Sequence, residues 1–134
     1  MINKELLENY ETLVQEAEFA FRDIAERCKE QVTCKVQCAD CCHSFFGLFP
    51  IEAAYISHQF PKLDRKVRKG VLERAAQAEQ RLMDLDIELQ EKFGDDEEKK
   101  LKEAAKLRVR CPLLSDEDKC VLYQYRPITC RVYG

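Results

Sequence analysis

The chain of 134 residues has no tryptophan, only four glycines and only four prolines. It also lacks a long apolar run, because its most apolar segment, Phe45 to Tyr55, is interrupted by Pro50 and Glu52. A transmembrane helix needs about 20 apolar residues in succession, so we expect no segment that spans a membrane. There is no glycine-rich phosphate loop, no GxSxG sequence and no paired-histidine zinc-hydrolase motif, so the sequence gives no sign of those enzyme classes.

An excess of positive charge is missing as well. The chain carries 22 basic and 25 acidic residues, with a net charge of −3. This balance leaves no electrostatic footprint for nucleic acid or for an anionic membrane surface, and we expect neither as a partner. The first residues, Met1 to Glu8, are acidic where a signal peptide would have a basic start and an apolar run. We therefore expect a cytoplasmic protein, whose thiols stay reduced.

What the chain does have is cysteine, eight residues in all. Seven of them form two groups, Cys34, Cys38, Cys41 and Cys42 within nine positions, and Cys111, Cys120 and Cys130 later in the chain. Close-set thiols suit a soft metal, because several sulfurs must converge on one point. Disulfide bonds are the alternative that the even cysteine count permits, but a reducing compartment favours metal or redox chemistry.

The first group has the spacing of a metal-binding loop. Two residues separate Cys38 from Cys41, which lets both sulfurs face one metal, and the three-residue gap after Cys34 still allows convergence. Cys41 and Cys42 are adjacent, so their side chains tend to diverge. One of this pair is expected to bind the first centre, while the other binds a second centre, fills the core or serves as a reactive thiol.

The second group supplies the remaining ligands, because a four-thiolate site usually draws on two chain segments. Seven clustered thiols exceed one mononuclear site, so they indicate either an iron–sulfur cluster with spare thiols or two zinc sites. Seven cysteines are the candidate ligands of an iron–sulfur cluster or, as the alternative, of zinc: Cys34, Cys38, Cys41, Cys42, Cys111, Cys120 and Cys130. The sequence does not select four among them.

Three further residues near the thiols have two readings each. His43 is either a fourth ligand or, on the other reading, a hydrogen-bond donor behind the ligands or a surface residue. Arg126 and Arg131, which flank Cys130, either form salt bridges and offset thiolate charge or grip a carboxylate or phosphate group beside the metal. Both arginines are therefore kept as candidate cofactor-binding residues. No catalytic residue can be assigned.

Apolar periodicity predicts helices over most of the chain. The first runs from residue 3 to about 32, with an apolar stripe of Leu6, Tyr10, Leu13, Ala17, Phe21, Ile24 and Cys28. A short helix starts at Pro50 and stops near Phe60. Long and charged helices follow at 62–93 and 97–108, separated by a break at Gly94. Residues 111–123 predict a small hairpin or paired loop, and a helix begins near Pro127.

These elements predict a mostly α fold. We expect residues 1–134 to form one small helical domain with a long central helical hairpin and a cysteine-rich metal-binding loop region. Such a modest core would gain from a metal that ties its segments together. The chain ends four residues after Cys130, which suggests that a C-terminal part is missing.

Two stretches resemble a known family. Residues Cys34-x3-Cys38-x2-Cys41-Cys42 come first, followed by Cys111-Pro-Leu-Leu and then by Cys120-Val-Leu-Tyr-x2-Arg126-Pro-x2-Cys130-Arg131-x-Tyr133. This order of motifs is similar to the YkgJ-type cysteine-cluster family, whose signature is CxxCxxCC, except that the first gap here is three residues instead of two. The resemblance implies zinc or iron chelation by the cysteines. Flagellin lysine-N-methylases look similar around the cluster and are longer, which adds a methyl-transfer reading.

Three functional hypotheses follow. The first is an iron–sulfur protein that serves in electron transfer, sensing or protein modification. The second is a structural zinc module whose helices present an interaction surface to a protein partner. The third is an enzyme similar to the methylases, for which the sequence shows no cofactor pocket.

Overall fold

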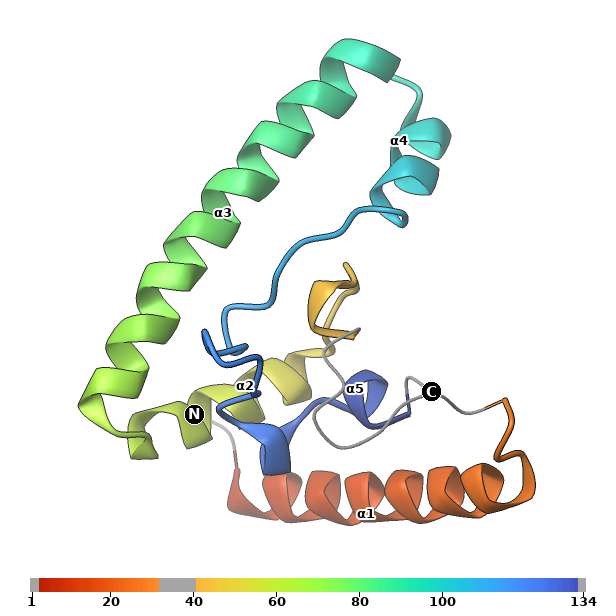
Figure 1. Cartoon of the computed structure of the whole chain (residues 1–134), viewed down its shortest axis with the longest axis vertical. Helices are drawn as coiled ribbons and strands as arrows, with labels where there is room; N and C mark the ends of the chain where they lie inside the picture. Colours follow the sequence, from red (N-terminus) through yellow and green to blue (C-terminus); the bar gives the residue numbers. More distant parts are fainter. Residues whose placement is uncertain (1–2, 32–40, 133–134) are drawn as a thin grey trace. The chain divides into compact units, whose positions relative to one another are not determined.

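The computed structural model describes residues 3–31 and 41–132. The predicted mostly α fold is confirmed, because α-helices dominate these residues and no named strand occurs among them (Figure 1). No helix in the described ranges is both long enough and apolar enough to cross a membrane. The predictions for Cys34 and Cys38 lie outside the described residues.

The chain groups into two compact units. One, which we call the helical unit, comprises Met1–Cys38, Leu48–Leu63 and Leu122–Gly134. The other, the cysteine unit, comprises Ala39–Gly47 and Asp64–Val121. The expectation of a single domain over residues 1–134 stays a prediction.

Helix α1 of the helical unit, Lys4–Arg27, begins at a side-chain cap, because the Asn3 side chain accepts a hydrogen bond of 3.0 Å from the Glu5 amide. The helix ends at Arg27, a few residues before the predicted end near residue 32. Cys28 has left the helical region with φ −123° and ψ 45°, and its carbonyl accepts a turn bond from the Gln31 amide. No glycine or proline marks this stop, so the sequence offered no signal for it.

The buried face of α1 differs in part from the predicted stripe. Tyr10 and Val14 are buried with Tyr55 from helix α2, Pro50–Gln59. The partly buried residues packed on this core are Leu7, Ile51, Tyr125 and Ile128. By contrast, three of the predicted inward residues are at least half exposed: Leu6, Leu13 and Ile24. The prediction that these three residues face the core was wrong. Both sides of the helix carry apolar residues, and periodicity alone does not choose between them.

Three tyrosines form the centre of the helical unit. The rings of Tyr10 and Tyr55 lie 5.1 Å apart at 65°, and those of Tyr55 and Tyr125 lie 5.9 Å apart at 69°. Edge-to-face pairs of this kind add about 0.5–1.5 kcal/mol beyond the area that they bury. Tyr125 belongs to the 3₁₀ turn Tyr123–Tyr125, so the last segment of the chain packs on α2 through this cluster.

A buried carboxylate joins two helix starts. Glu52 is only 3% exposed, and its oxygens accept hydrogen bonds from the Phe49 amide at 2.8 Å and from the Ile128 amide at 3.0 Å. These amides stand at the starts of α2 and of α5, Ile128–Val132, where backbone N–H groups have no partner inside the helix. One glutamate therefore caps two helices that are far apart in sequence.

The cysteine unit contains the predicted helical hairpin. Helix α3, Arg65–Phe93, and helix α4, Glu97–Ala104, fold back on each other around Gly94, whose φ of 56° suits glycine (Figure 1). Asp64 and Asp96 cap the two helices through the Lys66 and Lys99 amides. The predicted stripe of α3 is confirmed, since all eight members are buried or partly buried: Val67, Val71, Ala75, Ala78, Leu82, Leu85, Leu89 and Phe93.

Two predicted helix limits were wrong. The long helix starts at Arg65 instead of residue 62, because a separate 3₁₀ turn, Phe60–Lys62, precedes the Asp64 cap. The charged helix stops at Ala104 instead of near Arg108. Residues after Leu107 leave the helix to pair with another segment, since the Val109 amide donates to the His43 carbonyl at 3.1 Å. Long-range pairing of this kind overrides local helix propensity.

The Tyr10 hydroxyl is buried and has no hydrogen-bond partner among the described residues. Burial raises the pKa of Tyr10 to about 12, the Glu52 carboxylate adds to the rise, and Arg131 opposes it. Because the folded chain holds this phenol protonated, its contribution to stability is present below the usual pKa of 10.0 and is lost as pH rises toward 12. We expect Tyr10→Phe to reduce this alkaline loss of the unfolding free energy.

At pH 7, Tyr10→Phe should cost less than about 0.5 kcal/mol, because the hydroxyl that it removes has no partner. Tyr55→Phe is the matched control: the Tyr55 hydroxyl donates to Glu11 at 2.8 Å, so its loss should cost about 0.5–1.5 kcal/mol. Urea unfolding followed by circular dichroism measures both variants at pH 7 and at pH 11. Equal losses of unfolding free energy in the two variants at pH 7 would contradict this account. So would a decrease in unfolding free energy between pH 7 and pH 11 that is as large in Tyr10→Phe as in the unaltered chain.

Candidate metal centre

Three segments of the cysteine unit carry thiols. Cys41 and Cys42 lie in the 3₁₀ turn Cys41–His43, and Cys111 and Cys120 stand on either side of a tight turn. Cys41 is buried, while the other three are partly buried. None of the cysteines within residues 3–31 and 41–132 is paired in a disulfide bond.

Backbone pairing holds the first segment against the second. The Cys111 amide donates to the Cys42 carbonyl at 2.6 Å, the Val109 amide donates to the His43 carbonyl, and Ser44 forms an antiparallel bridge with Arg108. Paired residues on adjacent extended segments lie a few ångströms apart. The main chain therefore brings Cys42 and Cys111 together even though 69 positions separate them in sequence.

A hairpin-like turn adds Cys120. Leu114 forms an antiparallel bridge with Cys120, and the Val121 amide donates to the Leu113 carbonyl at 2.9 Å. Leu114 is 1% exposed and anchors the turn, whose left-handed residue is Asp118 with φ 58°. The predicted hairpin or paired loop at 111–123 is thus present as a short paired turn, and Cys111 and Cys120 stand on its two arms.

The four thiols interact electrostatically. Burial raises the pKa of the Cys42 thiol to about 12, and the neighbouring Cys41, Cys111 and Cys120 raise it further in that order. Burial also raises the pKa of Cys111, with a further rise from Cys41. Each thiolate would therefore repel the others in a partly dry environment, which is the situation that a bound cation relieves.

Two features favour the charged form of Cys111. The backbone amides of Leu113 and Leu114 hydrogen-bond to its sulfur and lower its pKa, and so does the nearby Arg74 guanidinium. Arg74 Nε donates to the Pro112 carbonyl at 2.9 Å, which fixes this charge beside the thiol. Amide donors to a sulfur and a cation next to it are features of thiolates that bind metals.

The donor set fits a soft metal in its chemistry, since the Cys41, Cys111 and Cys120 thiols all lie within electrostatic reach of Cys42. Within the part of the chain that the structure describes, however, no three His, Cys, Asp or Glu side chains are arranged to hold a metal ion. Cys34 and Cys38 lie outside that part, and Cys130 belongs to the helical unit. The assignment of the seven cysteines as ligands therefore stays a prediction.

Arg126 and Arg131 make extensive contacts within the helical unit. Arg131 is only 8% exposed, and its guanidinium pairs with Glu18 of α1 and donates to the carbonyls of Arg126 and Gln124. Arg126 donates to the carbonyls of Tyr123 and Cys130 and lies 3.9 Å over the Tyr123 ring.

These contacts tie the end of the chain to α1, and they favour the salt-bridge reading of the two arginines over the ligand-gripping one. Their role in cofactor binding stays a prediction. His43 contributes its carbonyl to the pairing with Val109, which the sequence did not indicate.

Sequence reasoning missed Arg74. It lies on α3 among charged residues, where periodicity marks it only as a helix residue next to the apolar stripe. Its side chain is 17% exposed, and its contact with Pro112 spans 38 positions. No sequence pattern signals such a contact.

A family model matches residues 33–134, which is most of the chain. The family is named CxxCxxCC and is described as "Putative zinc- or iron-chelating domain". The comparisons with curated proteins and with solved structures found no match.

We expect Arg74→Gln to lower the unfolding free energy of the metal-free chain by about 1–3 kcal/mol, because it removes a charged donor from the Pro112 carbonyl in a partly buried hydrogen bond. Lys69→Gln is the matched control on the same helix: among the described residues Lys69 pairs with the exposed Glu73 at 3.9 Å, so its loss should stay below about 0.5 kcal/mol. Urea unfolding of both variants checks this. Equal losses would mean that Arg74 does not hold the turn.

Proposed function

Because the chain belongs to the CxxCxxCC family of zinc- or iron-chelating domains, we propose that its cysteine unit holds a metal on thiolates and that this metal is an iron–sulfur cluster. One observation carries the proposal: Cys41, Cys111 and Cys120 all act on the charge of the Cys42 thiol, although they come from distant parts of the chain. A site of this kind closes long loops, as metal sites that fix a fold do.

Four residues would hold the metal within the described part of the chain: Cys41, Cys42, Cys111 and Cys120. The other predicted ligands, Cys34, Cys38 and Cys130, belong to the helical unit, and their part in metal binding stays a prediction. When bound, a cluster would supply one-electron redox chemistry. The chain's own residues would hold the sulfurs in place, shield them by burial and donate amide hydrogen bonds to Cys111. Hydrogen bonds to the sulfurs are one means of tuning a cluster's reduction potential.

The role that fits such a centre in a reducing cytoplasm is electron transfer, sensing or protein modification. Purification without air, followed by absorption spectra and analysis of iron, sulfide and zinc, tests the proposal. We expect a coloured protein with iron and sulfide in comparable amounts. A colourless protein with stoichiometric zinc and no iron would contradict the iron–sulfur part, and a protein without any of these would contradict metal binding itself.

Structural zinc is the second candidate, and the sparse regular structure around the thiols favours it. In the part of the chain that the structure describes, residues 105–121 form only isolated bridges and turns. Leu114 is the one residue of this stretch whose side chain is buried. A small core of this kind is often completed by a structural metal. On this reading, a chelator should unfold the turn at 111–121 and no redox-active chromophore should exist.

Cysteine substitutions locate the metal. We expect Cys42→Ser to lower the bound metal by more than about half, because it removes the thiol at the centre of the group. Cys28→Ser is the matched control: Cys28 is also partly buried, but it ends α1 in the helical unit and acts there through its backbone N–H. Metal content per chain is measured for both variants. Full metal retention in Cys42→Ser, or an equal loss in both, would contradict the assignment.

A further inference from the structure

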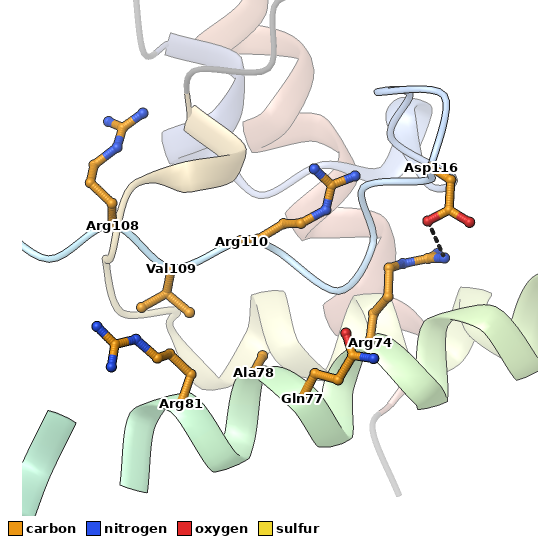
Figure 2. A pocket seen from close by; sticks show the side chains of 8 residues that line it. All are labelled: Arg74, Gln77, Ala78, Arg81, Arg108, Val109, Arg110 and Asp116. Carbon is orange, nitrogen blue, oxygen red and sulfur yellow. Dashed lines mark ion pairs between the residues drawn. The ribbon is translucent and has the colours of Figure 1, made fainter. Parts of the chain in front are cut away.

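Helix α3 has a second apolar surface, on the side turned away from residues 108–110. Figure 2 shows Arg74 on the side of α3 that faces these residues. Successive residues of an α-helix are about 100° apart, so Leu72, Met83 and Ile87 come on the opposite side of the helix. They are 60%, 57% and 57% exposed. Apolar residues that stand alone on a surface are ordinary, but these three share one side of one helix.

The exposed apolar residues of this side form a line, which we call the outer stripe: Leu72, Ala76, Met83 and Ile87. Leu72 and Met83 are 11 residues apart, and so are Ala76 and Ile87. Eleven residues are close to three turns, so the stripe stays on one side of the helix. It is also symmetric about its midpoint, which lies between residues 79 and 80. An apolar line of this kind is a surface against which a second helix can pack.

Charge is distributed along α3 in two halves of opposite sign. Residues 65–78 contain five basic residues and one acidic residue, whereas residues 79–93 contain five acidic and two basic ones. This order opposes the helix dipole, which favours acids near the N-terminus and cations near the C-terminus. Helix α4 follows that preference, with Glu97 and Glu98 in its first turn and Lys102 in its last. The reversed order on α3 therefore does not stabilise the helix itself, and it favours a role outside the helix.

The helix that packs on α3 leaves the charges of α3 for another partner. The lysines of α4 pair with acids close to them in sequence: Lys99 with Asp96, Lys100 with Glu97 and Lys102 with Glu98. In the basic half of α3, Lys69 lies 3.9 Å from Glu73, and both side chains are mostly exposed. Exposed ion pairs of this length contribute little, so this contact is easily exchanged for one with a partner.

We propose that α3 pairs in the antiparallel direction with α3 of a second copy of this chain, through the outer stripe. The symmetry of the stripe fits a two-fold axis at its midpoint. Leu72 of one copy then meets Ile87 of the other, and Ala76 meets Met83, so a small residue lies opposite a large one. A two-fold interface uses the same surface twice, and this surface is complementary to itself. The pairing is additional to the metal-binding function.

The two charged halves determine the direction of the pair. In an antiparallel dimer, the basic half of each α3, residues 65–78, lies beside the acidic half of the other, residues 79–93. A parallel pair would bring like charges together, which disfavours it. The opposite helix dipoles of an antiparallel pair act in the same sense as the charged halves. Because the outer stripe is short, we expect a weak dimer with a dissociation constant of about 1–100 µM.

Sedimentation velocity of the metal-loaded full chain tests the proposal, without air so that no intermolecular disulfide forms. Between about 1 and 500 µM we expect a monomer–dimer equilibrium. Leu72→Glu should raise the dissociation constant at least about tenfold, because it places a carboxylate opposite Ile87 in the acidic half of the other copy. Leu101→Glu is the matched control: Leu101 is 73% exposed on α4, outside the outer stripe, so this variant should dimerise as the unaltered chain does.

Charge reversal tests the direction. Arg65→Glu/Lys69→Glu and Asp86→Lys/Glu91→Lys should each raise the dissociation constant at least about tenfold, because like charges then meet at both ends of the dimer. An equimolar mixture of these two chains should dimerise again, since opposite charges meet in the mixed pair. Circular dichroism shows that each variant keeps its fold, and the charge-reversed chains decide if Leu72→Glu does not fold.

A chain that stays monomeric at about 500 µM would overturn the proposal. So would an equal effect of Leu72→Glu and Leu101→Glu on the dissociation constant, because the contact would then not depend on the outer stripe. Charge-reversed chains that dimerise alone as well as the unaltered chain, or that stay monomeric when mixed, would likewise overturn it.

Discussion

Burial of four thiols whose ionised forms would repel one another is the constraint on which the cysteine unit depends. Cys41, Cys42, Cys111 and Cys120 share a partly dry space, and burial together with their neighbours raises the pKa of Cys42 to about 12. Without a cation, these groups must stay protonated, and they contribute little attraction to hold their segments together. A metal that displaced these protons and bound the thiolates would join the segments at 41–44 and 108–121, which otherwise pair through few backbone hydrogen bonds.

The helices of this protein could be predicted because their patterns are local. The stripe of α3 recurs at spacings of three and four, and Gly94 with the Asp96 cap marks the turn of the hairpin. The ends of α1 and α4 were missed for a different reason. Arg27 is followed by no breaker, and Leu107 to Arg110 leave the helical path only because a distant segment offers its backbone groups. Such pairing depends on tertiary structure that propensity does not record.

The two groups of cysteines could also be predicted, because cysteines at short spacings usually have a function. The sequence did not predict which of these cysteines lie near one another. Nothing in the order of residues shows that Cys42 would face Cys111 and Cys120, or that Arg126 and Arg131 would contact Glu18 and backbone carbonyls. Arg74 escaped notice for the same reason, because an arginine on a charged helix looks like part of a solvated face until its contact with the Pro112 carbonyl is known.

X-ray absorption at the iron and zinc edges of the protein purified without air tests the central claim most directly, because it reports the atoms that surround the metal. The account predicts a shell of sulfur atoms at about 2.3 Å. It further predicts that this shell is lost or diminished in Cys111→Ser/Cys120→Ser. A shell of oxygen and nitrogen atoms, or a sulfur shell that the double substitution leaves unchanged, would show that these thiols do not hold the metal.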